Sequence, residues 1–72
     1  MHYYSNLSGN SSVVAYEYGA DFIRVQFNSG YPYVYSYHSA GRNNVEEMKR
    51  LANVGQGLCS FINRRVKYNY EQ

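Results

Sequence analysis

Two alternating segments joined by a three-residue turn constrain the fold of this 72-residue chain more than any other feature. Residues 22–27 and 31–37 are rich in aromatic and β-branched side chains, and Asn28-Ser29-Gly30 lies between them. This tripeptide suits a hairpin loop that ends in a left-handed glycine, which places Val25 opposite Tyr33. A two-residue loop would instead shift the pairing by one residue and exchange the two faces of the second strand.

The pairing register decides where four tyrosines of the second segment lie. They are Tyr31, Tyr33, Tyr35 and Tyr37. In the three-residue register they share a face with the apolar side chains of residues 22–27, which is the face that a helix should cover. The turn therefore favours a core built from these rings, with the hydroxyls reaching its rim. A mixed arrangement would bury Tyr33 and Tyr35 in part and leave Tyr31 and Tyr37 at the edge of a pocket. The alternative is an exposed platform on which nucleobases stack.

The remaining pattern predicts an α+β fold, in which a three-stranded antiparallel β-meander is followed by two short α-helices packed on one face. Residues 13–18 alternate and supply the first strand. Residues 44–53 predict a helix capped by Asn43 or Asn44, and residues 58–66 predict a second helix. The side chains expected to face the sheet are Val45, Met48, Leu51, Ala52, Leu58, Phe61, Ile62 and Val66.

The N-terminal residues differ from the rest of the chain. Residues 1–11 are rich in Ser, Asn and Gly and carry no periodicity, so we expect a flexible leader ahead of a single domain over residues 12–72. A chain of this size buries only about 60% of the surface that it exposes when unfolded, which predicts marginal stability.

The composition indicates a cytoplasmic protein. Cys59 is the only cysteine, so no disulfide within the chain is possible and a reducing compartment fits best. The first residues lack the basic start and apolar run of a signal peptide, and no stretch has the length of a membrane span.

Residues that would carry catalysis or bind a metal ion are scarce. His2 and His38 are the only histidines, and neither lies at metal-ligand spacing from Cys59. Glu46 and Glu47 are adjacent on a predicted helix and therefore point apart, unlike a paired acid and base. We therefore expect no enzyme, no metal site and no cofactor.

Cations and aromatic rings alternate near the C-terminus. The net charge is only +2, but six of the seven Lys and Arg residues lie in the second half of the chain. Residues 63–70 interleave cations with tyrosines and asparagines, as contacts to phosphates and bases require, although charged runs are also frequent on solvated helix faces. The candidate ligand-binding residues are Tyr33, Tyr35, Tyr37, Arg24, Asn63, Arg64, Arg65, Lys67 and Tyr68.

A succession of short motifs spans residues 12–70. They are Ile23-x-Val25-x-Phe27-x-Ser29-Gly30, Tyr33-Val34-Tyr35, Phe61-Ile62-Asn63, Val66 and Tyr68-Asn69-Tyr70. This succession resembles the KTSC domain, a family named for the C-terminal extension of some lysyl-tRNA synthetases. Tyr33 and Tyr35 match the family's Tyr-x-Tyr motif, whereas the Val-Pro pair usual after it is missing. The resemblance implies a binding module, with RNA as the ligand suggested by attachment to a synthetase, and names no catalytic residues.

Three functions fit these observations. The first is binding of RNA or another nucleic acid, with cations on phosphates and tyrosines on bases. The second is a small homo-oligomer that sequesters a nucleotide-like small molecule, as some phage-encoded counter-defence proteins do. The third is a protein interaction module that adds a partner strand to the edge near residues 31–37.

Overall fold

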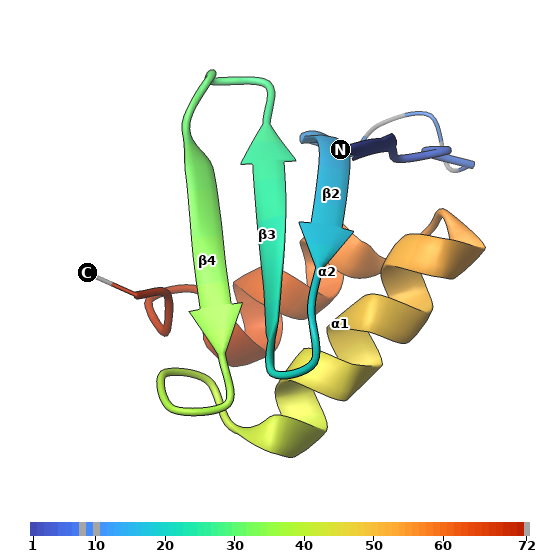
Figure 1. Ribbon diagram of the computed structural model, residues 1–72. Coiled ribbons are helices and arrows are strands. Elements are labelled where there is room, and N and C mark those ends of the chain that lie inside the picture. The colour runs from blue at the N-terminus through green and yellow to red at the C-terminus, as the bar shows by residue number, and fades with distance from the viewer. Residues whose placement is uncertain (8, 10, 72) are drawn as a thin grey trace.

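Four antiparallel strands form one sheet, and the helices cover one of its faces (Figure 1). The protein is represented by a computed structural model that describes residues 1–7, 9 and 11–71. The strands lie in the order β1-β2-β3-β4, so each strand pairs with the next one along the chain. Their bounds are His2–Tyr3 for β1, Val13–Tyr18 for β2, Phe22–Phe27 for β3 and Pro32–Ser36 for β4. The predicted α+β class and the helices on one face are confirmed.

The predicted number of three strands is wrong by one. β1 lies antiparallel to β2, with His2 opposite Tyr16. Tyr4, which directly follows β1, is buried, and its hydroxyl accepts a hydrogen bond from the backbone N–H of Leu58 at 3.2 Å. β1 was missed because two residues are too few to show alternation. It lies within the segment predicted to be a flexible leader; positions 8 and 10 of that segment, and position 72 of the predicted domain, are outside the described residues.

The predicted register of the β3–β4 hairpin is confirmed. Val25 lies opposite Tyr33, and Ile23 lies opposite Tyr35. The loop is closed by a hydrogen bond of 3.0 Å from the N–H of Gly30 to the carbonyl of Phe27, and Gly30 has a φ of 98°. Because only glycine adopts this conformation at little cost, the turn residues place Tyr33 and Tyr35 on the helix-covered face.

The first helix begins earlier than predicted. α1 spans Arg42–Val54, and its N-cap is Gly41 instead of Asn43 or Asn44. The Asn44 side chain lies inside the first turn, where its Nδ2 donates to the carbonyl of Ala40 at 2.9 Å. An asparagine can bond the backbone from a cap or from within the helix, so its presence alone does not set the start of the helix.

The second predicted helix has the predicted range but two geometries. α2 covers Leu58–Phe61, and the π-helical segment η1 continues from Ile62–Val66. Leu58, Ile62 and Val66 are all buried, so this continuous segment presents one apolar stripe to the sheet. Among the described residues, no helix is long and apolar enough to cross a bilayer.

The core lies between the sheet and the helices. Its fully buried side chains are Ile23, Val25, Tyr35, Val45, Met48, Leu58 and Val66. Of the residues predicted to face the sheet, Leu51 and Phe61 are only partly buried, at the margin of this cluster. Tyr35 is thus a core residue, whereas Tyr31, immediately before the start of β4, is exposed. A hollow opens beside this core, where Ile62 and Asn63 of η1 line it.

Candidate functional site

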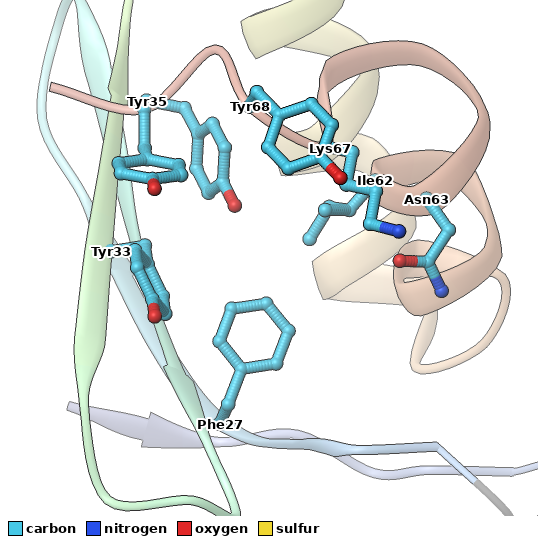
Figure 2. A pocket seen from close by; sticks show the side chains of 8 residues that line it. Phe27, Tyr33, Tyr35, Ile62, Asn63, Lys67 and Tyr68 are labelled. Carbon is cyan, nitrogen blue, oxygen red and sulfur yellow. The ribbon is translucent and has the colours of Figure 1, made fainter.

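A pocket of about 240 Å³ lies between the strands β3 and β4 and the C-terminal segment. Figure 2 shows Phe27 and Tyr33 on the strand side of the pocket and Ile62, Lys67 and Tyr68 on the helical side. Its lining residues are Phe27, Tyr33, Tyr35, Ile62, Asn63, Lys67, Tyr68 and Tyr70. Five of these eight side chains are aromatic, so the pocket is suited to a flat, unsaturated group.

The aromatic wall is a direct result of the hairpin register. Tyr33 and Tyr35 are two residues apart on β4 and therefore point to the same face. The ring of Phe27 lies edge-on to Tyr33, with centroids 5.5 Å apart. The Tyr70 ring completes the wall, with its centroid 4.7 Å from that of Tyr33 and 6.3 Å from that of Tyr35. Four rings thus touch in series along one side of the pocket.

Tyr70 is placed by a contact between the C-terminal tail and β4. The N–H of Glu71 donates to the carbonyl of Val34 at 2.6 Å, and the Glu71 carboxylate also accepts a hydrogen bond from the Ser36 hydroxyl. These bonds hold the tail along the outer edge of β4. The neighbouring Tyr70 side chain therefore turns inward over the sheet.

The opposite wall is polar at its rim. Asn63 in η1 and Lys67 directly after it are four residues apart and both line the pocket. The ammonium of Lys67 lies 5.4 Å from the centroid of the Tyr68 ring, a cation–π distance. Both Asn63 and Lys67 are exposed. The pocket therefore joins an aromatic interior to an accessible positive charge.

Ion pairing leaves the excess positive charge in the C-terminal segment. Three cations elsewhere have carboxylate partners: Arg24 pairs with Glu17 at 2.7 Å, Lys49 with Glu46 at 2.8 Å and Arg50 with Glu47 at 2.6 Å. Among residues 1–7, 9 and 11–71, Arg42, Arg64, Arg65 and Lys67 form no such pair. Three of these four cations lie in or next to η1, beside the pocket.

The structure brings together five of the nine predicted ligand-binding residues. Those in the pocket are Tyr33, Tyr35, Asn63, Lys67 and Tyr68. Arg64 and Arg65 are exposed on the same segment but do not line the pocket. Arg24 lies on the open face of the sheet, because it alternates with the buried Ile23 and Val25.

Tyr37 is separated from the pocket by its contact with α1. Its hydroxyl donates to the Glu46 carboxylate at 2.6 Å, and this hydrogen bond raises the pKa of the Tyr37 phenol. The ammonium of Lys49 lies 5.8 Å from the Tyr37 ring centroid and also donates to the carbonyl of Ala20 at 3.1 Å. Tyr37 therefore belongs to a satisfied cluster at the first half of α1.

Sequence reasoning missed three lining residues, Phe27, Ile62 and Tyr70. Phe27 and Ile62 were expected to face the core, and the hairpin register gave a signal for Phe27 because it shares a face with Tyr33. Tyr70 lies in the run 63–70 where cations and rings alternate, but nothing in that run indicates that its ring joins Tyr33 and Tyr35. Its position depends on the bond between Glu71 and Val34, which are far apart in the sequence.

Burial changes the chemistry of one pocket hydroxyl. Tyr35 is only 2% exposed, and this burial, with smaller contributions from the nearby Tyr33 and Tyr70, raises its pKa to about 12. The Tyr35 hydroxyl therefore stays protonated at neutral pH and remains able to donate a hydrogen bond.

No family model, curated protein or solved structure matches this chain. The resemblance to the KTSC domain therefore stays a prediction.

The outer edge of β4 offers few backbone groups to a partner strand. Every second residue of β4 directs its backbone N–H and C=O groups away from β3, and these residues are Pro32, Val34 and Ser36. Pro32 has no N–H, the N–H of Ser36 donates to Ser39 Oγ at 3.0 Å, and the carbonyl of Val34 accepts from Glu71. These contacts argue against strand addition at this edge.

Proposed function

We propose that the protein is a non-catalytic module that binds single-stranded RNA, or another single-stranded nucleic acid, through the aromatic pocket. The observation that carries this proposal is the placement of Lys67, an unpaired cation among the described residues, at the rim of a pocket with four contiguous rings. Rings of this kind stack on bases with about 1–3 kcal/mol per base, and Lys or Arg side chains neutralise phosphates.

The size of the pocket favours a single base. Its volume of about 240 Å³ lies just below the range of roughly 300–1,000 Å³ that is typical of small-molecule sites. A base in a duplex is stacked and paired, and it would have to be flipped out to enter. A single strand can supply an unpaired base directly, and Arg64 and Arg65 are then placed to contact neighbouring phosphates.

A free nucleotide is the second candidate ligand, as in the sequestering function. One observation favours it: the ring of Tyr68 is 74% exposed at the rim of the pocket. An apolar ring that remains open to water here would be covered if a second copy of the chain closed the pocket over a nucleotide.

The salt dependence of binding tests the proposed function. A short, fluorescently labelled single-stranded RNA is titrated with the protein at several salt concentrations. We expect affinity to fall as salt rises, because phosphate contacts release counterions. Lys67→Gln should make the plot of the logarithm of the binding constant against the logarithm of the salt concentration less steep by about 0.7. Arg50→Gln is the matched control, since it removes the same charge from a residue that is paired with Glu47 on α1.

Two results would contradict the proposal. One is salt-independent binding or no binding, and the other is an equal effect of Lys67→Gln and Arg50→Gln. An unlabelled mononucleotide is added as a competitor in the same assay. If the mononucleotide competes as well as RNA at equal base concentration, and the protein elutes as an oligomer from a sizing column, the sequestering function replaces RNA binding.

A further inference from the structure

The tyrosine hydroxyls of this protein fall into two groups. Outside the pocket, buried or packed hydroxyls have partners within the protein. Tyr4 accepts from the N–H of Leu58 at 3.2 Å, Tyr16 and Tyr18 donate to Asn53 Oδ1 at 3.2 and 3.3 Å, and Tyr37 donates to Glu46 at 2.6 Å. The fold therefore satisfies hydroxyls where its packing covers the rings.

The hydroxyls that line the pocket are different. Tyr33, Tyr35 and Tyr70 have no hydrogen-bond partner among residues 1–7, 9 and 11–71, although Tyr35 is 2% exposed and the other two are half-buried. Among the described residues no buried side-chain nitrogen or oxygen lacks a partner, so these three unpartnered hydroxyl oxygens are accessible and can bond a molecule that occupies the pocket they line.

The aromatic wall of the pocket contains one ring without a hydroxyl, so stacking on this wall does not itself require hydroxyl groups. Phe27 supplies a ring to the wall without any polar atom, and its centroid lies 5.5 Å from that of Tyr33. The Tyr33, Tyr35 and Tyr70 rings are in mutual contact through Tyr70, so their hydroxyls belong to one cluster. Burial keeps the Tyr35 hydroxyl protonated, as its raised pKa indicates, and it is therefore a permanent donor.

We propose that the inner part of the pocket binds the hydrogen-bonding edge of a nucleobase, with the Tyr33, Tyr35 and Tyr70 hydroxyls as its partners. This inference rests on the proposed function and adds that the base is recognised by its polar edge as well as by stacking. A base with ring nitrogens and exocyclic groups fits this cluster, whereas an apolar ring of the same shape leaves the hydroxyls unpaired. Lys67 at the rim then meets the phosphate of the same nucleotide.

Apolar base isosteres test the inference. The RNAs carry a single uridine or adenosine among abasic sites, or an apolar ring of the same shape at that position. We expect the wild-type protein to bind each polar base about 3- to 10-fold more tightly than its isostere for each hydrogen bond formed. Tyr35→Phe should lose part of this preference without weaker binding of the isostere. Tyr3→Phe is the matched control, because it removes the same atom from a β1 side chain that is 86% exposed and does not line the pocket.

Tyr33→Phe and Tyr70→Phe remove the other two hydroxyls, at half-buried positions. These two variants serve as the test of the inference if Tyr35→Phe fails to fold. Equal binding of polar bases and isosteres by the wild-type protein, with salt-dependent binding retained, would overturn the inference and leave the proposed function standing. A base preference that all three Phe variants retain would also overturn it. Absence of binding to every RNA would instead contradict the proposed function itself.

Discussion

The contact between the N-terminal segment and the end of α1 yields a sharp prediction about Gly55. This residue is buried, has a φ of 91°, and accepts a hydrogen bond at its carbonyl from the N–H of Leu7 at 2.7 Å. A methyl group added to Gly55 would lie 2.6 Å from Cβ of Ser5, which is too close for two non-bonded carbon atoms. Gly55→Ala should therefore strain the backbone and also push the N-terminal segment away.

The two costs can be separated with a second glycine. A left-handed alanine costs about 1–2 kcal/mol, and overpacking costs about 1–3 kcal/mol. Gly57 has a similar φ of 87°, but a methyl group there meets only Cδ2 of Leu51 at an ordinary 3.5 Å. We expect Gly57→Ala to lower the free energy of unfolding by only the backbone cost of about 1–2 kcal/mol. Gly55→Ala should lower it by about 2–5 kcal/mol, a large fraction of the whole free energy of unfolding of a small domain.

Urea unfolding followed by circular dichroism measures both variants against the wild type. Ser5→Gly removes the atom that clashes, so the double variant with Gly55→Ala should recover the difference between the two single variants. Equal losses for Gly55→Ala and Gly57→Ala, or no recovery in the double variant, would refute the packing of residues 5–7 against Gly55. The predicted flexible leader would then describe this segment better.

Two further predictions concern the core. Tyr35 is protonated in both states below pH 10, but its folded pKa of about 12 lies above its ordinary value of 10.0, so stability should fall by up to about 3 kcal/mol as the pH rises from 10 to 12. Urea unfolding across this range checks it, and an equally steep fall in Tyr35→Phe would contradict it. Met48→Ala should cost about 2–5 kcal/mol, because its side chain is fully buried between α1 and the sheet. Val54→Ala, at an exposed site, should cost under about 0.5 kcal/mol, and similar losses in thermal unfolding of both would speak against this core.

The parts of the fold that depend on local chemistry could be predicted from the sequence. Asn28-Ser29-Gly30 determines the loop length, and the loop length determines that Tyr33 and Tyr35 face the helices. β1 could not be predicted, because its two residues carry no periodic pattern and are ordered by pairing with β2. The predicted N-cap of α1 was wrong because the Asn44 side chain bonds the carbonyl of Ala40 from inside the helix, and Gly41 is the cap.

The residues of the candidate site could likewise be predicted only in part. Residue types and the interleaving of cations with rings identified Lys67 and Tyr68, and the hairpin register identified Tyr33 and Tyr35. Arg24 was predicted to bind ligand together with them, but strand alternation places it on the open face, where it pairs with Glu17. Tyr70 was missed because only the folded chain brings the tail beside β4.

If the protein binds a nucleic acid as proposed, the uneven pairing of its charges should affect how the two molecules approach each other before any contact is made. Glu17, Glu46 and Glu47 pair with Arg24, Lys49 and Arg50, whereas Arg64, Arg65 and Lys67 lie without a carboxylate partner in or next to η1. A small net charge can then still orient an approaching polyanion, because three of the cations without a carboxylate partner are close together in the sequence. Collisions would be biased toward pocket-first encounters. Low salt should therefore accelerate association more than it slows dissociation.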